Sequence, residues 1–449
     1  MKKMLFCLTA LLLLCACAAA EPPTEGSCGP GLTWTLDADG LLTVTGSGAM
    51  EDYAWNRLPA WTEGGRVRRV VLDGVTHVGD YAFSRCTSLT EVSLGGAESV
   101  GSSAFEGCGA LYSCPLPAGL RSIGAYAFGG CAIPEITIPL SVTEIGEAAF
   151  GGELSAIRVA EGHSAFTAVN GVLFTADMRT LLRYPPCRAG TSYTVPEGVE
   201  ALGTESLSSC NFLTAVYLPD TLTAIGSKAF KWTQNIPSIR IPDSVTSIGW
   251  GAFNITGLEQ ITIPGGVTVL EDGVFAYCDA LRSVTLPDSI VSIGDEAFAG
   301  CVSLGALRLP AALESIGADA FADAGSLRGS MLDLRVPDTV DRVGDGAFLS
   351  AAYRLICPEG GAAEAYALTY GHDHVTFYAH TLELPLDTVS IGDEAFARLG
   401  EHVNIRIPPA TVSISDSAFE QSTVLLLVSE GSFAAAWAEE KELPWLAEP

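Results

Sequence analysis

The sequence predicts a repeat solenoid, mostly of β-structure with short helical turns, built from about thirteen coils of 22–23 residues. Three observations predict this fold. An anchor phenylalanine recurs at nearly constant spacing, glycine and alanine precede it at fixed positions, and an alternating apolar segment follows it. A unit of this length cannot bury its own apolar face, so neighbouring units must stack. The chain, at 449 residues, is also too long for one compact core.

Thirteen anchors define the repeat. They are Phe83, Phe105, Phe128, Phe150, Leu207, Phe230, Phe253, Phe275, Phe298, Phe321, Phe348, Phe396 and Phe419. Glycine stands four residues before the anchor in eleven copies, and alanine stands directly before it in eleven. Six copies carry cysteine three residues after the anchor: Cys86, Cys108, Cys131, Cys210, Cys278 and Cys301.

Each coil is expected to contain two short strands and one turn of helix. The alternating segment Leu281–Pro287 predicts a first strand that the proline ends. Residues 290–294 predict a second strand, followed by a tight turn that the glycine permits. The next residues predict a helical turn, because Asp295 and Glu296 suit a helix start. The anchor side chain should point inward and stack on its counterpart one coil away.

The ends and the interruptions divide the chain. Residues 21–64 predict an N-terminal β cap, since apolar residues alternate on both sides of Asp37–Gly40 as in a hairpin. The array itself spans 65–350 and is interrupted at 160–196. Two alanine-rich segments, 71 residues apart around Tyr366 and Trp437, predict short helices that each pack one aromatic ring. They suggest a helical insertion at 351–380, then the last repeats and a helical C-terminal cap at 381–449.

Residues 1–20 are typical of an export signal. Lys2 and Lys3 precede an apolar run, Met4 to Leu14, that is too short to span a membrane. Two processing alternatives stay open. Cleavage before Glu21 would give a secreted protein, whereas acylation of Cys17 would give a lipid-anchored surface protein. No later segment predicts a transmembrane helix, so contact with a membrane is expected only through a lipid on Cys17.

Ten of the 13 cysteines lie outside the signal region. Six of them share one repeat position, where they are expected to be free, buried and small rather than bridged. Side chains at that position run parallel from coil to coil, which is poor geometry for a disulfide. Any disulfide should therefore come from the four cysteines outside this column, and their pairing stays open: Cys28, Cys114, Cys187 and Cys357.

The composite pattern L-x-x-V-x-L-P, V-x-x-I-G-x-x-A-F-x-x-C resembles the leucine-rich repeats of the BspA-like surface-protein family. The resemblance covers nearly all of residues 65–449, and the block from Cys28 to Trp61 is similar to the family's opening segment. It implies a leucine-rich repeat array, with a β-hairpin insertion at 160–196. It also implies a surface protein that adheres to host matrix or to other cells, although fold alone does not determine function.

Catalytic and cofactor motifs are missing from the sequence. The net charge of −28 argues against nucleic-acid binding, because the field has the wrong sign. His372, Asp373 and His374, with His380 nearby, form the one histidine cluster, and a solvated loop explains it better than a metal site. Acidic pairs such as Asp295–Glu296 recur at one repeat position and so do not indicate a glycosidase. We predict no enzyme activity, no cofactor and no metal.

One column of residues is a candidate ligand-binding surface. The outward position of the first strand carries arginine in five coils, and stacking would place these residues on one sheet face. The candidates are Arg158, Tyr217, Arg240, Arg308, Arg335 and Arg406. Such a stripe suits an acidic protein segment or an acidic glycan. In the alternative, these are ordinary solvent-facing residues whose arginines pair with nearby acids such as Asp333.

These observations lead to an expected function. The leading hypothesis is a non-enzymatic, exported cell-surface protein that binds an extracellular protein or an acidic glycan through the concave face of the solenoid. A structural envelope spacer without a specific ligand is the alternative, and a secreted hydrolase is a remote one.

Overall fold

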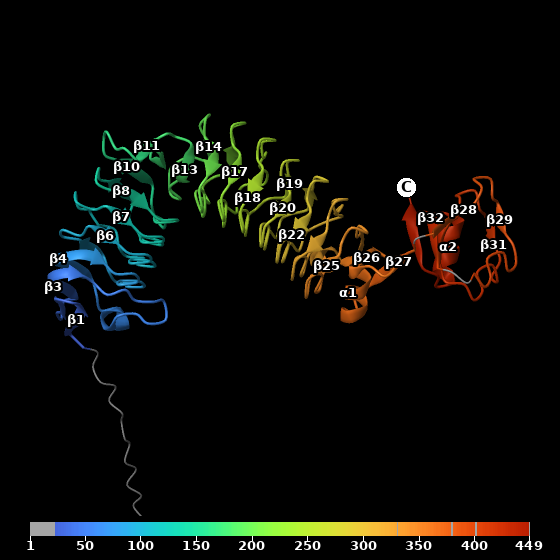
Figure 1. Ribbon diagram of the computed structural model, residues 1–449, viewed down its shortest axis with the longest axis horizontal. Helices are drawn as coiled ribbons and strands as arrows, with labels where there is room; N and C mark the ends of the chain where they lie inside the picture. Colours follow the sequence, from blue (N-terminus) through green and yellow to red (C-terminus); the bar gives the residue numbers. More distant parts are fainter. Residues whose placement is uncertain (1–22, 330, 379, 400–401, 449) are drawn as a thin grey trace, which may run out of the picture.

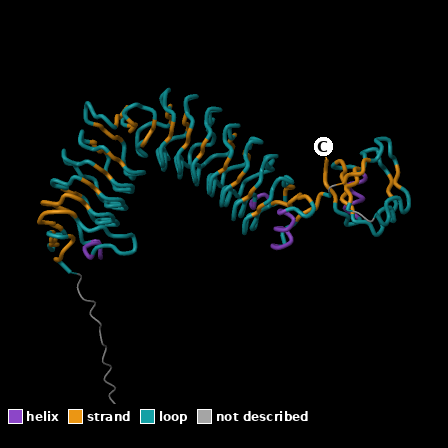
Figure 2. Tube along the Cα trace, in the orientation of Figure 1, coloured by secondary structure: helices purple, strands orange, loops and turns teal. Residues whose placement is uncertain are grey.

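The computed structural model describes residues 23–448, except 330, 379 and 400–401. The export signal and Cys17 therefore lie outside the described residues and stay predictions. The described chain winds into an arched solenoid, coil upon coil, that ends in a separate C-terminal unit (Figure 1). Strands occupy short segments of each coil, and loops and turns make up the rest (Figure 2). The predicted repeat solenoid is confirmed.

A three-stranded antiparallel sheet opens the array. Its strands are β1 (Glu25–Gly29), β2 (Leu32–Leu36) and β3 (Leu41–Ala49). At the turn between β2 and β3, Asp37 Oδ1 accepts the backbone N–H groups of Asp39 and Leu41 at 3.0 and 2.8 Å. β3 pairs in parallel with β4 (Arg69–Val78), the first strand of the array. Trp61, on the 3-10 helix η1 (Ala60–Gly65), lies with its ring centroid 5.9 Å from that of Phe83 and covers the first anchor.

Two sets of short strands run along the array, and within each sheet consecutive members of a set pair in parallel, as β15 with β17 and β22 with β23. In most members of the first set, burial alternates along the strand. The set comprises β5 (Glu91–Ser93), β8 (Glu135–Ile138), β10 (Ala156–Val159), β14 (Ser192–Thr194), β16 (Ala215–Tyr217), β19 (Gln260–Thr262), β21 (Ser283–Thr285), β24 (Leu332–Arg335), β28 (His380–Glu383) and β30 (Val403–Arg406). The second set has two residues each and comprises β6 (Ser99–Val100), β7 (Ser122–Ile123), β9 (Glu144–Ile145), β15 (Ala201–Leu202), β17 (Ala224–Ile225), β18 (Ser247–Ile248), β20 (Val269–Leu270), β22 (Ser292–Ile293), β23 (Ser315–Ile316), β25 (Arg342–Val343), β29 (Ser390–Ile391) and β31 (Ser413–Ile414).

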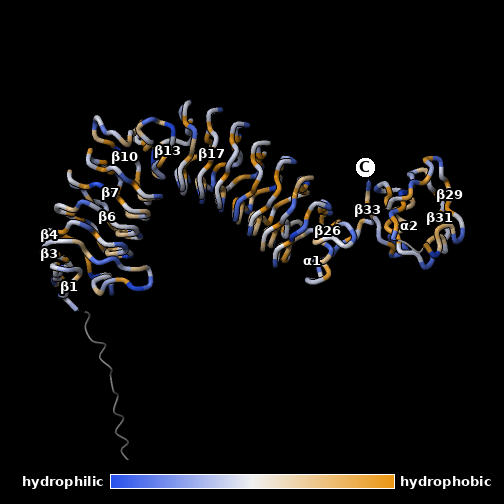
Figure 3. The backbone as a smooth tube through the Cα atoms, viewed as in Figure 1, coloured by the Kyte–Doolittle hydropathy of each residue, from blue (hydrophilic) through white to orange (hydrophobic). Residues whose placement is uncertain are grey.

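The anchor phenylalanines stack as predicted. Rings of consecutive coils are nearly parallel, as between Phe83 and Phe105 (centroids 5.2 Å apart, planes 5° apart) and between Phe321 and Phe348 (5.3 Å, 1°). Hydrophobic segments recur along the array (Figure 3), and its buried apolar residues form clusters that include the anchors. Aromatic stacking and burial therefore hold neighbouring coils together.

The predicted helical turn around the anchor is wrong. The residues two before and two after the anchor have left-handed backbone conformations, as at Glu296 (φ 54°) and Gly300 (φ 68°). The anchor N–H bonds to the next coil rather than within its own turn, as from Phe298 to the Ala320 carbonyl at 2.7 Å. Asp295, which we expected at a helix start, accepts the backbone N–H of Ala318 in the next coil at 2.7 Å. Bonds between coils therefore alternate with turn bonds within a coil, such as that from the Cys301 N–H to the Phe298 carbonyl at 3.1 Å, and no helix forms.

The repeated glycine has a different role from the expected one. At Gly124 a Cβ atom would lie 2.5 Å from the carbonyl carbon of Gly101, and at Gly317 it would lie 2.5 Å from that of Gly294. These glycines have no left-handed φ. Close approach of stacked backbones, rather than a tight turn, explains the absence of a side chain.

All ten described cysteines are free, and all but Cys187 are buried. In the cysteine column the thiol also has a polar role. Cys278 Sγ lies 3.0 Å from the Phe253 carbonyl oxygen, and Cys301 Sγ lies 3.1 Å from that of Phe275. Thr233 places its hydroxyl 3.1 Å from the equivalent Leu207 carbonyl oxygen. The column therefore favours small side chains, and most of its thiols lie within hydrogen-bond distance of the anchor carbonyl one coil earlier, although Ala324 at the same position has no donor.

A hairpin insertion interrupts the array after β10. Its strands are β11 (Phe166–Val169), β12 (Val172–Thr175) and β13 (Thr180–Arg183). Asn170 and Gly171 form the first turn with φ of 52° and 84°, as a two-residue hairpin turn requires. β13 then pairs in parallel with β15, and Tyr184 donates its N–H to the Ser206 carbonyl at 2.7 Å. Tyr184 thus occupies the anchor position of a new coil.

Two strand–helix–strand modules end the stacks of anchors. The first consists of β26 (Tyr353–Pro358), α1 (Ala362–Tyr370) and β27 (His374–Phe377). The second consists of β32 (Val424–Ser429), α2 (Phe433–Glu440) and β33 (Trp445–Glu448), a last strand that the sequence did not predict. Tyr366 of α1 lies 5.7 Å from Phe348, and Trp437 of α2 lies 5.8 Å from Phe419, both between ring centroids. We call these segments the first and second cap modules.

The cap modules also pack on each other. Ile356 and Val375 of the first module share an apolar cluster with Leu427 and Leu446 of the second. These residues are equivalent, because each pair is separated by the same 71 positions that relate Tyr366 to Trp437. The C-terminal unit, with its own core, therefore docks on the array through matching surfaces of the two caps.

Candidate functional site

The first strands carry Arg158, Tyr217, Arg335 and Arg406, whereas Arg240 and Arg308 lie in the equivalent segments of coils in which no strand is formed there. All six side chains point to the exposed side. Buried neighbours flank each of them, as Ile157 flanks Arg158 and Leu334 flanks Arg335. The column does not form one continuous stripe. Arg158 lies before the hairpin insertion, Arg406 lies in the C-terminal unit, and the other four candidates lie in the array between these two breaks.

Four of the five arginines form ion pairs. Arg158 pairs with Glu135, and this pairing lowers the pKa of the Glu135 carboxyl. Arg406 binds both Glu383 and Glu448. The ion pairs of Arg240 with Asp220 and of Arg308 with Asp288 have N–O distances of 3.0 and 2.9 Å.

These pairs follow a rule that the sequence contains. Asp220 and Asp288 each follow the proline that ends the first strand of the preceding coil. Pairing neutralises most of the column, so its long-range field is weak. Tyr217, the remaining polar candidate, has an exposed ring on β16.

Arg335 differs from the other arginines of the column. Among the residues that the structure describes, no acid forms an ion pair with it. Asp333, the acid that the sequence suggested, pairs instead with Arg354 at 2.7 Å. The Arg335 guanidinium lies over the Phe377 ring, 4.7 Å from its centroid, in a cation–π contact.

Arg308 and Arg335 line one cleft of about 760 Å³. One wall comes from the last coils of the array, and the other comes from the first cap module, including Glu359, Phe377 and Tyr378. Glu359 is held by His402 of the C-terminal unit. Ion pairs occupy Arg308 and Asp333, and His402 contacts Glu359. Asp338 lines the cleft without an ion pair to any described residue. Arg335 is left as the cation available to a ligand in this cleft, which we call the Arg335 cleft.

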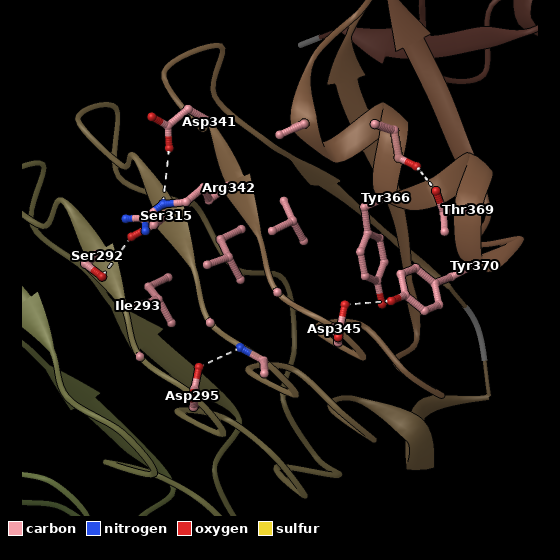
Figure 4. A pocket seen from close by; sticks show the side chains of 18 of the residues that line it. Ser292, Ile293, Asp295, Ser315, Asp341, Arg342, Asp345, Tyr366, Thr369 and Tyr370 are labelled. Atoms are coloured by element: carbon pink, nitrogen blue, oxygen red, sulfur yellow. Dashed lines mark hydrogen bonds and ion pairs between the residues drawn. The ribbon is translucent and has the colours of Figure 1, made fainter.

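A second cleft, of about 810 Å³, lies beside the second strands and α1. Figure 4 shows Tyr366 and Tyr370 projecting from α1 toward Asp345. Tyr370 donates its hydroxyl proton to Asp345 at 2.8 Å, and Asp295 accepts the N–H of Ala318. These polar groups already bond to each other or to the backbone, so this cleft offers a ligand fewer free partners than the Arg335 cleft.

The histidine cluster is structural where the structure describes it. His372 bonds through Nε2 to the Tyr353 carbonyl oxygen at 2.9 Å, and burial lowers the pKa of the imidazole. The neutral ring then donates this bond. Across the described part of the chain, no group of three or more histidines, cysteines or acids is placed to hold a metal ion. Likewise, none of its helices combines the length and the apolar character needed to cross a membrane.

The repeat geometry agrees with the comparisons with known proteins. The sequence profile of the BspA-type leucine-rich repeat region matches in six copies, over residues 69–170, 185–291, 270–354 and 375–429. The chain belongs to this family. The profile accounts for the array and for most of the C-terminal unit, while the N-terminal cap and α1 lie outside its matches.

Solved structures of bacterial proteins resemble this one. A leucine-rich repeat protein of Eubacterium ventriosum is 26% identical with a TM-score of 0.54, over 67% of this chain and 94% of that one. A leucine-rich cell-surface protein of Faecalibacterium prausnitzii is 23% identical (TM-score 0.39; 64% and 94% covered). A leucine-rich repeat protein of Bacteroides ovatus is also 23% identical (TM-score 0.41; 78% and 99% covered). A search of curated proteins finds no match.

Proposed function

We propose that the chain is a non-enzymatic binding protein of the bacterial surface that recognises anionic groups of an extracellular protein or glycan at the Arg335 cleft. The unpaired guanidinium of Arg335, held against Phe377 in a cleft of about 760 Å³, carries this proposal. Arginine binds carboxylate and sulfate groups in a fork of two hydrogen bonds, and an aromatic wall adds contact area. Membership of a family of surface repeat proteins and the predicted export signal support an exported location.

The cleft also gives a reason why one point of the column, rather than all of it, would bind. Arg240 is exposed and bears the same charge, yet Asp220 occupies it, and it lies outside this cleft. A ligand there would have to displace an acid without gaining an enclosing wall. At Arg335 the partner would meet a free cation and would be enclosed by the first cap module.

Binding assays with matched variants test the proposal. The protein would be screened against sulfated and carboxylated glycans, acidic peptides and extracellular-matrix proteins, with saturable binding as the readout. Arg335→Glu should weaken binding by about tenfold or more, because it places a carboxylate against an anionic ligand. Arg240→Glu, with the same change in charge in the same column, should change the affinity by less than about twofold.

The other outcomes each favour another function. Equal losses in both variants would move recognition to the whole column. If no partner binds saturably, the result would favour a structural envelope spacer. Lipidation of Cys17 would then be the next property to measure. Turnover of a substrate in the same panel would support the hypothesis of a secreted hydrolase.

A further inference from the structure

A second site lies where the hairpin insertion joins the array. The sheet that begins at the N-terminus ends at β9, and a new sheet begins with β11 and continues through β13 and β15. A cavity of about 170 Å³ lies between the two sheets. Gly146, Glu147 and Phe150 line it from the first side, and Arg183 and Thr204 line it from the second.

Arg183 occupies an unusual position for a charged residue. Because Tyr184 takes the anchor place, Arg183 stands where most coils have a buried alanine. Its side chain is accordingly buried, with 5% of the residue's surface exposed. A guanidinium keeps its charge in proteins, so this burial places a cation inside the molecule.

The hydrogen bonds of Arg183 are one-sided. Its Nη1 donates to the Ser208 hydroxyl at 2.9 Å and to the Glu205 carbonyl. Its Nε is buried and has no hydrogen-bond partner among the described residues, and none of their hydrogen bonds involves Nη2. Because Nε has almost no accessible surface, Nη2 is the unpaired nitrogen of the guanidinium that a ligand can reach.

The surrounding acids do not neutralise Arg183. In the described chain it forms no ion pair. Glu205 directs its carboxylate elsewhere, to the Tyr126 hydroxyl at 2.9 Å and to Lys228 Nζ at 3.7 Å. Glu147 lines the cavity but is exposed to solvent. An unpaired buried charge destabilises a fold, so a compensating group is expected.

A second unpaired polar group lies in the next coil. Ser206 holds the same repeat position as Arg183, directly before the anchor. Its hydroxyl oxygen is buried and has no hydrogen-bond partner in the described structure. Of these two unsatisfied groups, Arg183 lines the cavity and Ser206 does not, so only Arg183 indicates a ligand.

We propose that the cavity beside Arg183 binds a small carboxylate anion, which accepts a hydrogen bond from Nη2 of the guanidinium. A monovalent, planar anion fits better than phosphate, because Glu147 would repel a higher charge and the cavity is small. The bound anion would neutralise Arg183 and strengthen the junction between the two sheets. This site is independent of the Arg335 cleft.

Thermal unfolding with acetate as the probe tests the site. At pH 7 and constant ionic strength, sodium acetate should raise the Tm by about 2–6 °C at saturation relative to sodium chloride. Calorimetry should give one acetate per chain. Equal Tm values in acetate and chloride, or no heat of binding, would overturn the proposal. A larger effect of phosphate than of acetate would overturn the carboxylate assignment.

Two arginine variants localise the effect. Arg183→Met should abolish the acetate response and, in chloride, should unfold at a higher temperature than the unmodified protein, because the buried charge is gone. Arg179→Met is the matched control, since Arg179 is exposed and ion-paired with Glu200 immediately before β13. It should keep the full response. An acetate response that survives in Arg183→Met would contradict the site. If Arg183→Met does not fold, the calorimetry of the unmodified protein still tests whether acetate binds.

Discussion

At the scale of single residues, the glycine column sets how closely the coils can stack. Gly294 would place a Cβ atom 2.7 Å from the backbone nitrogen of Asp272, whereas Gly392, at the same repeat position, would meet nothing within 4 Å. The difference arises because Gly392 belongs to the first coil of the C-terminal unit, which has no coil before it. We expect Gly294→Ala to lower the free energy of unfolding by about 1–3 kcal/mol.

Denaturant unfolding of this pair of variants separates crowding from backbone effects. Gly392→Ala should be neutral or slightly stabilising, because alanine reduces the freedom of the unfolded chain. Equal destabilisation by both substitutions would show that the glycines serve a turn, as the sequence first suggested.

The thiols give a second prediction at this scale. Burial raises the pKa of Cys108 to about 12 and that of Cys278 to about 11, so these thiols stay protonated donors at neutral pH. Cys187 is the one described cysteine that is not buried, although desolvation and Glu153 raise its pKa as well. We expect a thiol reagent at pH 8 to modify one cysteine in the folded protein and ten after unfolding of the described chain. Cys187→Ser should remove the early reaction, and a second fast thiol in that variant would contradict the burial of the column.

At the scale of elements, the cap module completes the hydrogen bonds of the last coil. The Phe348 N–H, which in other coils bonds to the next coil, donates to the Tyr366 hydroxyl of α1 at 3.0 Å. Tyr366→Phe keeps the ring against Phe348 but leaves this N–H unpaired. The expected loss in the free energy of unfolding is about 1–3 kcal/mol. Tyr370→Phe, whose hydroxyl bonds to Asp345 at an exposed position, should cost less than about 0.5 kcal/mol. Chemical denaturation of both variants gives the comparison.

Much of each element could be predicted from the sequence, because repeated positions average out local ambiguity. Alternation identified the strands, and the anchor spacing identified the stacked rings of Phe83 to Phe348. The sequence pattern could not show that the predicted helical turn around the anchor is absent. Acidic residues followed by alanine and phenylalanine suit a helix start, and the bonds that prevent it come from another coil. Tertiary contacts therefore override local propensity around every anchor.

At the scale of the whole molecule, the candidate site depends on contacts that no local pattern contains. The column of arginines and its pairing with nearby acids were predictable, but the pairing of Asp333 with Arg354 and the cleft around Arg335 were not. Phe377 reaches Arg335 only because β27 follows α1 back to the array. The buried charge of Arg183 likewise depends on where the hairpin rejoins the array. The spacing of the repeat therefore predicts the solenoid, whereas the two candidate sites form where the repeat is interrupted.

The interruptions also divide the core, so we expect the molecule to unfold in parts. Phe298 lies in a core that extends from the hairpin insertion to α1, and Phe419 lies in the separate core of the C-terminal unit. Stability in repeat proteins is close to a sum of local terms and contacts between neighbours. Phe298→Ala should cost about 3–5 kcal/mol and lower amide protection within residues 172–367. Phe419→Ala should instead lower protection within 391–446 and leave the array protected. Hydrogen exchange measured by mass spectrometry distinguishes the two patterns. Loss of protection throughout the chain in both variants would mean that the contact between the cap modules couples the two cores into one cooperative unit.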